Sequence, residues 1–370
     1  MCYHPAEATS SDSKVSLTCK DIMGQFPITA ITIENLKHAL NDWGEAEYRA
    51  GQIMDWVYRK PITRFSDMTN LPPALRERLD NEFTFQSVEP IKEIRSRREN
   101  AVKTLFRLHD GQTIESVLML YNKRRTICVS SQVGCAFTCP LCATGAGGFE
   151  RNLAPAEIID QVLYFSRQLK AADQSVSNVV FMGMGEPLVN FEAVWQAIES
   201  LTNPQLLNIG ARHITVSTSG IAPGIRKLAK KKLQVGLAVS LHAPNDELRD
   251  ELVPPNKMYP LEVLMNACRQ YIRSTNRRIS FEYAIIKGLN DSPQIAAELG
   301  NLLRGINCFV NIIPVNPSEH SGFSPPPKSK IEYFSEMLMR HHVANTVRMR
   351  RGSDIEAGCG QLRSRLQDIS

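Results

Sequence analysis

Apolar residues recur every three or four positions in the front part of the chain. Between Thr32 and Asn70 they include Ile33, Leu36, Leu40, Ile53, Trp56 and Val57. This spacing places them on one face of short helices. Leu71-Pro72-Pro73 then opens a further helical stretch, because proline is favoured in the first turn of a helix. We therefore predict a flexible polar leader over residues 1–25 and a small helical domain over residues 26–100.

The pattern changes to alternation of apolar and polar residues over residues 104–121, TLFRLHDGQTIESVLMLY. Alternation with a period of two is typical of a β-strand with one buried face. Asp110-Gly111 lies in the middle of the stretch, and this dipeptide favours the tight turn of a β-hairpin. We predict a β-hairpin linker over residues 101–121.

From residue 126 onward, short apolar runs alternate with longer helical stretches. The runs are TICVSS at 126, NVVFMG at 178, HITVSTSG at 213, VGLAVSLHAP at 235, ISFEYAII at 279, FVNIIPVNP at 309 and TVRMRR at 346. Successive runs start roughly 20 to 50 residues apart, which allows a crossover helix in most intervals. We predict an α/β core over residues 122–356, a parallel sheet curved into a partial (β/α)6 TIM-like barrel, and a C-terminal segment over residues 357–370.

A polar or glycine-rich cluster follows almost every predicted strand. The clusters are the cysteine loop after Ser131, Gly183 to Glu186, Ser217 to Gly220, His242, Asn316 and the region of Cys359. In parallel α/β folds, ligands bind at the carboxyl ends of the strands. Six clusters in register therefore predict one site.

Composition and charge narrow the class of protein. The chain has 370 residues, of which 43% are hydrophobic and 22% charged, as in ordinary globular proteins. No apolar run approaches the ~20 residues that a membrane helix needs, and the first residues contain no secretory pattern, so we expect a cytoplasmic protein without a membrane partner. Residues 1–120 contain 15 basic and 17 acidic residues, against 28 and 21 in the rest. This basic excess permits a polyanionic partner.

Three of the nine cysteines are bunched in one loop. Cys135, Cys139 and Cys142 lie within eight residues, so one loop can wrap one metal centre. Structural zinc needs four ligands, and no histidine lies between His109 and His213. A four-iron cluster held by three cysteines leaves one iron open to a small molecule. The spacing therefore favours an iron–sulfur cluster and leaves zinc open.

The CxxxCxxC spacing after the first strand of the core resembles the radical S-adenosylmethionine (SAM) superfamily. In that superfamily SAM chelates the open iron of a [4Fe–4S] cluster, and an electron breaks SAM to release a 5′-deoxyadenosyl radical. GMGEP at 183–187 resembles the glycine-rich loop after the second strand of these enzymes. The resemblance implies two cofactors, a [4Fe–4S] cluster and SAM.

Other segments are similar to one branch of the superfamily, the RlmN-type rRNA and tRNA adenine C2-methyltransferases. They include SSQVGC at 130, ERNL at 150 and RGSDIEAGCGQL at 351, and the similarity runs from about Gly44 to about Leu362. The resemblance implies that SAM is bound at Gly185, Glu186, Ser217, Ser240, Leu241, His242 and Asn316.

The same resemblance assigns three residues to the reaction. Cys359 would take a methyl group from one SAM, and the radical from a second SAM would turn that group into a methylene radical that adds to adenine. Cys128 would release the product by forming a disulfide with Cys359, and Glu115 would accept a proton. Considered without the resemblance, Glu115 in a predicted strand is expected to face solvent.

The implied function is methylation of adenine carbon 2 in 23S rRNA, at the peptidyl-transferase centre, and in tRNA 3′ of the anticodon. The helical domain would bind RNA, a flavodoxin or ferredoxin would donate electrons, and the enzyme would be a monomer. Arg348, Arg350 and Arg351 are candidates for phosphate contacts. Three alternatives stay open: a Cfr-type adenine C8-methyltransferase that confers antibiotic resistance, a radical SAM enzyme acting on a protein or small metabolite, and an RNA-binding protein with a structural metal.

Overall fold

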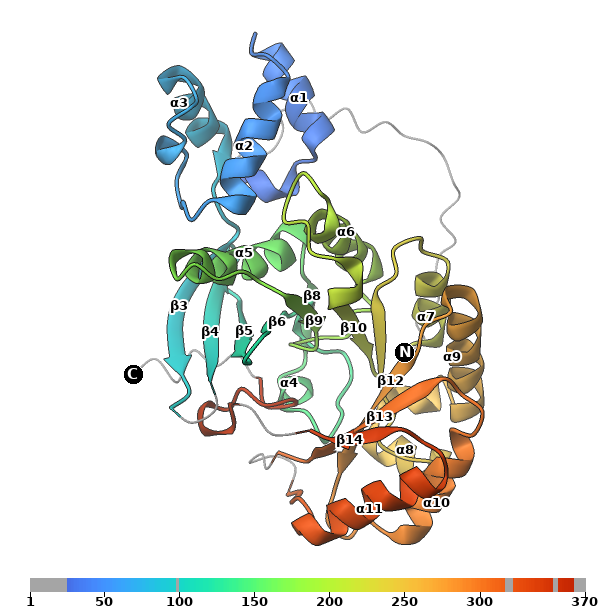
Figure 1. The fold of residues 1–370 in the computed structure, drawn as a ribbon. Coiled ribbons are helices and arrows are strands. Elements are labelled where there is room, and N and C mark those ends of the chain that lie inside the picture. Colours follow the sequence, from blue (N-terminus) through green and yellow to red (C-terminus); the bar gives the residue numbers. More distant parts are fainter. Residues whose placement is uncertain (1–24, 98–99, 317–321, 349–351, 363–370) are drawn as a thin grey trace.

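The computed structural model describes residues 25–97, 100–316, 322–348 and 352–362. The predicted N-terminal helices are confirmed as α1 (Ile33–Asp42), α2 (Tyr48–Arg59) and α3 (Pro73–Glu82). The unit begins and ends with a short parallel strand pair, β1 (Phe26–Pro27) and β2 (Phe83–Thr84). One 3-10 turn, Ile28–Ala30, precedes α1, and a second, Phe65–Asp67, lies between α2 and α3. Figure 1 shows this helical unit at one end of the molecule, beyond the main sheet.

Ten strands of the described residues form one sheet, in the order β14-β13-β12-β11-β10-β9-β6-β5-β4-β3. The strands from β6 to β14 pair in parallel with their neighbours. They match the seven predicted runs: β6 (Arg125–Cys128), β9 (Asn178–Phe181), β10 (Ile214–Thr218), β11 (Gly236–Ser240), β12 (Ile279–Ile285), β13 (Cys308–Pro314) and β14 (Asn345–Val347).

Helices connect these parallel strands and cover the outer side of the curved sheet (Figure 1). They are α5 (Pro155–Ala171), α6 (Phe191–Thr202), α7 (Ala222–Ala229), α8 (Asp246–Leu252), α9 (Leu261–Thr275), α10 (Pro293–Leu302) and α11 (Lys328–Arg340), with 3-10 turns at Ala211–His213 and Pro254–Lys257. Each of the six strands from β6 to β13 is followed by at least one helix before the next parallel strand. The predicted partial (β/α)6 barrel is therefore confirmed.

An antiparallel extension continues the sheet beyond β6. It consists of β3 (Val88–Arg95), β4 (Ala101–Leu108) and β5 (Thr113–Leu120). The hairpin of β4 and β5 was predicted, whereas β3 falls in the range that was predicted to be helical, and that part of the prediction is wrong. Its sequence VEPIKEIR contains a proline and four charges and lacks strand-like alternation, and its pairing with β4 is interrupted by a bulge after Pro90.

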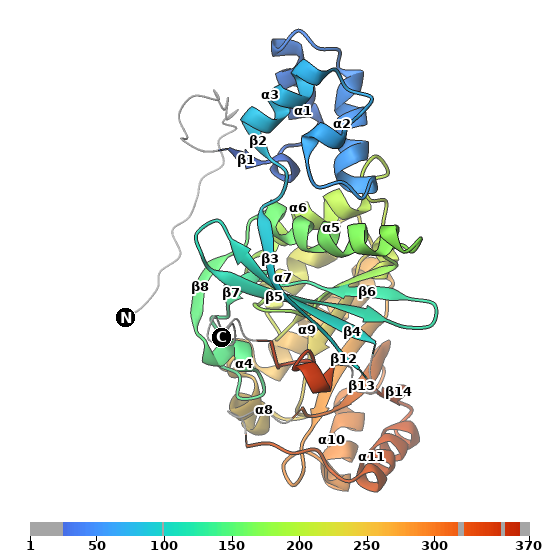
Figure 2. The same ribbon diagram turned by 90° about the vertical axis from the view of Figure 1, so that its left-hand side faces the viewer.

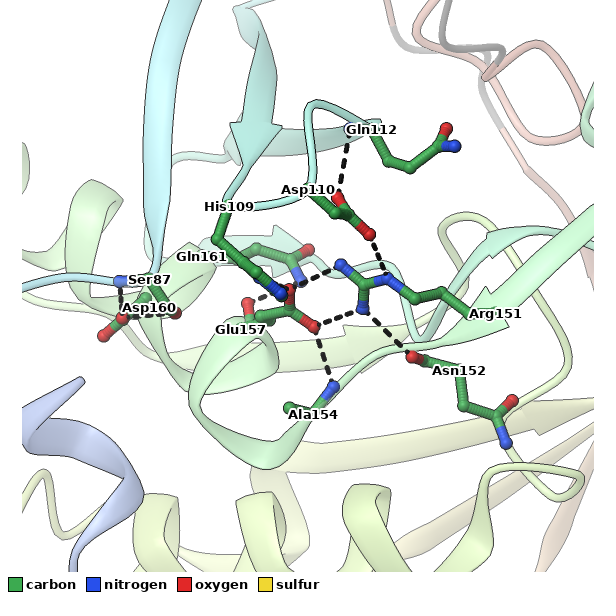
Figure 3. Close-up of polar contacts among 10 residues, drawn as sticks. All are labelled: Ser87, His109, Asp110, Gln112, Arg151, Asn152, Ala154, Glu157, Asp160 and Gln161. Atoms are coloured by element: carbon green, nitrogen blue, oxygen red, sulfur yellow. Dashed lines mark hydrogen bonds and ion pairs between the residues drawn. The ribbon is translucent and has the colours of Figure 1, made fainter. Parts of the chain in front are cut away.

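The hairpin turn is fastened to the core by Arg151, which belongs to the ERNL segment (Figure 3). Arg151 lies in β8 (Phe149–Asn152) and donates hydrogen bonds to both carboxylate oxygens of Glu157, each at 2.8 Å. Its Nε donates to Asp110 at 2.6 Å, and Glu157 also accepts from the backbone N–H of Ala154 at the start of α5. Arg151 of the ERNL segment therefore joins β8 to the hairpin turn and to α5.

Two further contacts join the helical unit to the core. Asp160 of α5 is buried and accepts hydrogen bonds from both the N–H and the hydroxyl of Ser87, each at 2.6 Å. Arg59 of α2 donates to the carbonyl of Leu206 at 2.6 Å. These bonds hold the unit against the outer layer of α5 and α6.

Candidate functional site

The six strand-end clusters converge on one cavity, as predicted. The cavity lies at the carboxyl ends of the parallel strands, where the clusters named above occupy most of its wall. Its lining includes Cys135, Cys139, Cys142, Gly183, Gly185, Glu186, Ser217, Ser240, His242, Glu282, Asn316, Arg348, Cys359 and Gly360. Residues separated by more than 200 positions in sequence thus face the same space.

The three bunched cysteines lie on the insertion between β7 (Gln132–Gly134) and β8, which also contains the short helix α4 (Ala143–Ala146). The loop folds tightly, because a Cβ atom at Gly145 would lie 2.4 Å from the carbonyl oxygen of Phe137. Burial, with a smaller influence of a charge on Cys142, raises the pKa of Cys135 to about 12. Among the described residues, no three His, Cys, Asp or Glu side chains are grouped as ligands of a single metal ion.

The donor set suits a cluster with one open iron and a polar small molecule beside it. Three thiols face the cavity, and thiolates are the ligands that iron–sulfur clusters use. Across the cavity, the buried Oδ1 of Asn316 has no hydrogen-bond partner. Buried polar atoms are nearly always paired, so an unpaired oxygen in the cavity wall fits a ligand that donates a hydrogen bond, such as an ammonium group.

Glu186 links the loop after β9 to the loop after β10 by hydrogen bonds. One oxygen of its buried carboxylate accepts bonds from the N–H and hydroxyl of Ser219, both at 2.7 Å, and the other accepts from the N–H of Leu188 at 3.1 Å. Burial is the largest influence on this carboxyl and raises its pKa. The neighbouring Gly185 has φ +94°, and a Cβ there would lie 2.5 Å from the side chain of Gln132. Glycine is therefore required for this loop to turn.

The end of β11 brings two of its three predicted contacts to the cavity. Ser240 and His242 line it, whereas Leu241 is fully buried in the hydrophobic core. Successive side chains of an extended chain point in opposite directions, so Leu241 cannot share the wall with its neighbours. His242 accepts a hydrogen bond at Nδ1 from the N–H of Ala284 at 2.9 Å, and burial lowers its pKa to about 3. Its ring is therefore neutral near pH 7.

Sequence reasoning missed Arg249, which donates hydrogen bonds to backbone carbonyls at the ends of β10 and β11. The side chain is fully buried and donates hydrogen bonds to the carbonyls of Ser219, Ser240 and Leu241 at 2.6 to 3.1 Å, and to Asn256. Burial lowers its pKa to about 10. Its surroundings in sequence, DELRDEL, are typical of a solvated helix, so only the three-dimensional arrangement identifies it.

The segment that contains Cys359 is docked on the cysteine loop (Figure 2). The backbone N–H of Ala143 donates to the carbonyl of Gly360 at 2.7 Å, and the hydroxyl of Thr144 donates to the carbonyl of Leu362 at 2.6 Å. From the opposite wall, Asn316 Nδ2 donates to the carbonyl of Cys359 at 3.2 Å. The Cys359 side chain is thereby placed in the cavity that the three bunched cysteines line.

Cys128 lies close to Cys359, at the end of β6. Burial of its thiol, together with a smaller influence of a charge on Cys359, raises its pKa to about 12. Arg348 lines the same cavity as Cys359, and its Nη1 is 3.6 Å from Glu282. Its role as a phosphate contact stays a prediction. Arg350 and Arg351 lie outside the described residues.

Glu115 does not face solvent, so that expectation is wrong. Its side chain is 5% exposed and forms an ion pair with Lys103, whose Nζ is 3.0 Å from Glu115 Oε1. Glu115 lies beside the cavity and is not part of its lining. It shares the inner face of the sheet with Cys128, because Val117, two residues along from Glu115, is directly opposite Cys128.

Comparison with known proteins agrees with this geometry over nearly the whole chain. Residues 28–84 match the family model "Ribosomal RNA large subunit methyltransferase N-terminal domain", and residues 129–299 match "Radical SAM superfamily". A probable dual-specificity RNA methyltransferase RlmN of Pelotomaculum thermopropionicum is 48% identical over 337 residues, 91% of each chain. The chain belongs to the RlmN family. Its RlmN relative in Bacillus subtilis is 44% identical and covers 91% of this chain and 93% of that protein.

A solved structure gives the same result for the fold. The crystal structure of a radical SAM methyltransferase from Sphaerobacter thermophilus is 46% identical, with a TM-score of 0.89, and covers 91% of this chain and 99% of that one. Radical SAM enzymes, RlmN proteins among them, use a [4Fe–4S] cluster and SAM, and this chain has a matching set of donors. No helix among the described residues is long and apolar enough to cross a membrane.

Proposed function

We propose that this chain methylates carbon 2 of adenine in 23S rRNA and in tRNA 3′ of the anticodon, with Cys359 as the carrier of the methyl group. The docking of the Cys359 segment on the cysteine loop, with Cys128 close by, carries the proposal. The RlmN relatives are named as dual-specificity RNA methyltransferases, which supports RNA as the substrate class and two RNA substrates.

Cys135, Cys139 and Cys142 would hold the [4Fe–4S] cluster. The residues that would contact SAM are Gly185, Glu186, Ser217, Ser240, His242 and Asn316. When bound, these groups supply a methyl group and a radical that can remove a hydrogen atom from a methyl carbon. Adenine carbon 2 is electron-poor and has no usable lone pair, so a methyl group cannot be placed there by simple displacement. A thiol carrier on the chain solves this problem.

Cys359 suits the role of carrier. Its thiol is exposed in the cavity between two glycines, so the sulfur is sterically accessible. Thiolates are strong nucleophiles that can take a methyl group from a sulfonium donor such as SAM. Methylated Cys359 would then join to adenine through its methyl carbon and form a covalent enzyme–RNA adduct.

Release of the product would use Glu115 and Cys128. The radical adduct would return one electron to the proposed electron-transfer partner, and Glu115 would accept the proton from adenine carbon 2. The thiol of Cys128 would lose its proton and attack the Cys359 sulfur, which breaks the sulfur–methylene bond and forms a disulfide. The released carbon would take up a proton and become the methyl group. Cellular thiols can reduce such a disulfide, in agreement with a cytoplasmic enzyme. We further propose a flavodoxin or ferredoxin as electron donor, a monomeric enzyme, and RNA binding by the N-terminal helical unit.

Anaerobic incubation with reductant, SAM and RNA tests the proposal when 5′-deoxyadenosine and 2-methyladenosine are scored together. We expect Cys359→Ala to abolish 2-methyladenosine and Cys128→Ala to accumulate the covalent adduct. Cys308→Ala is the matched control, because this free, half-buried cysteine does not line the cavity. Formation of 8-methyladenosine would support the Cfr-type alternative. Full activity of Cys359→Ala would overturn the proposal.

A further inference from the structure

Lys103 is a buried charged residue to which the proposed reaction assigns no task. It lies in β4 and is 7% exposed. Besides its ion pair with Glu115, its Nζ donates a hydrogen bond to the backbone carbonyl of Glu356 at 3.3 Å. One ammonium group therefore contacts both the proposed proton acceptor and the segment that contains Cys359.

The sheet places Lys103 and Glu115 on the same face as Cys128. Lys103 is directly opposite Val117, and Val117 is directly opposite Cys128. Residues opposite one another across a sheet point to the same side, so Lys103 and Cys128 share the inner face. Glu115 shares it as well, two residues from Val117.

The segment from Gly352 to Leu362 runs from the end of β3 to the cysteine loop. At its beginning, Asp354 accepts hydrogen bonds from the hydroxyl of Ser96 at 2.7 Å and the N–H of Arg97 at 3.1 Å. At its end it bonds to α4, as described above. Lys103 contacts it in between, three residues before Cys359. The segment is therefore held at both ends, and Lys103 contacts it between them.

We propose that Lys103 is a positioning residue that orients the Glu115 carboxylate and at the same time holds the Cys359 segment over Cys128. The role of Glu115 rests on the proposed function, whereas the hold on the segment does not. A charge pair in a low-dielectric site needs a fixed geometry and a third partner for the remaining donors, and the Glu356 carbonyl supplies that partner. The ion pair thus links the position of the base to the position of the methyl carrier.

Lys103→Met tests the hold on the segment, because methionine keeps the stem and removes the ammonium group. We expect amide hydrogen exchange over residues 352–362 to become about tenfold faster or more. We also expect formation of the Cys128–Cys359 disulfide under a mild oxidant such as diamide to slow by a similar factor. Neither readout depends on catalysis, so both remain informative even if the proposed reaction is wrong.

Three variants separate positioning from a general loss of stability. Lys103→Arg keeps the charge and should restore both readouts in part. Glu115→Gln removes only the carboxylate charge, so segment exchange should stay near the wild-type rate while RNA methylation falls in kcat with little change in KM. Arg107→Met is the matched control, because it removes an exposed ion pair with Glu89 from the same strand.

If Lys103→Met leaves both hydrogen exchange and disulfide formation at wild-type rates, the positioning role is wrong. The role is also wrong if Arg107→Met changes them equally. Should Lys103→Met fail to fold, Lys103→Gln and Lys103→Arg together decide the matter. Faster exchange and slower disulfide formation in Lys103→Gln, restored in part by Lys103→Arg, support a role for the charge. Wild-type rates in Lys103→Gln contradict it.

Discussion

Substitution of Gly360 by alanine probes the docking of the Cys359 segment more sharply than removal of any side chain. Gly360 has φ +78°, and a Cβ atom there would lie 2.5 Å from the carbonyl oxygen of Leu141 in the cysteine loop. The same residue accepts the hydrogen bond from Ala143. Gly360→Ala should therefore push the segment away from the loop without removing any of the reactive thiols.

Two contributions set the size of the effect. A left-handed backbone costs an L-residue roughly 1–2 kcal/mol. The contact with Leu141 is with backbone, which cannot move aside as a flexible side chain can, so the segment must lift and lose its hydrogen bond, which contributes about 1 kcal/mol. A total of about 2–3 kcal/mol lowers the equilibrium constant for docking by roughly 30- to 150-fold.

The assay is amide hydrogen exchange over residues 352–362, combined with the rate at which Cys359 becomes methylated. Gly305→Ala is the matched control: its φ is +74°, but nothing lies within 4 Å of the added Cβ, so it has only the backbone cost. We expect Gly360→Ala to exchange faster and methylate Cys359 more slowly, and Gly305→Ala to do neither. Equal behaviour of the two variants would refute the claim that close docking on the cysteine loop positions the methyl carrier.

Three other predictions concern His242, Arg151 and Arg249. The pKa of His242 in the folded state is about 3, below its ordinary value of 6.5, so the unfolded state takes up the proton first. The free energy of unfolding therefore falls as pH drops from 6.5 toward 3. In urea titrations at several pH values, His242→Gln should remove about 4 kcal/mol of this pH-dependent loss, and an unchanged pH profile would contradict the prediction. The hydrogen bond from Arg151 lowers the pKa of Asp110, so this pair stabilises the fold above the ordinary aspartate pKa and stops doing so as pH falls through the lowered value. Arg151→Lys should lower the free energy of unfolding by about 1–2 kcal/mol at pH 7. A loss below about 0.5 kcal/mol would show that the Arg151 contacts with Asp110 and Glu157 contribute little to stability. Arg249→Met leaves buried carbonyls without their donor and should cost at least about 3 kcal/mol, measured by the same titration; a wild-type midpoint would contradict the supporting role.

Most of the site could be predicted because its signals are local in sequence. Each parallel strand is a short apolar run, and the polar cluster that follows it must lie at one edge of the sheet. The cluster at His242 is an example, since β11 and the turn after it are contiguous. The spacing of Cys135, Cys139 and Cys142 is local as well, and one loop brings them together.

The remaining features depend on partners that are distant in sequence. Arg249 and Lys103 have ordinary neighbours in the chain, and only tertiary contacts with Ser219 and Glu356 make them structural supports. The strand β3 exists because β4 offers it an edge, which outweighs its charged composition. Leu241 was placed in the site by motif alone, and the alternation of side chains sends it to the core instead.

The location of the transferred methyl group tests the central claim most directly. Anaerobic incubation with reductant and SAM labelled in its methyl group, followed by peptide mass spectrometry, should find one added methyl group on the peptide that contains Cys359. That label should then move to adenine when RNA is supplied. Methylation of RNA by a protein whose Cys359 never carries the label would contradict the account.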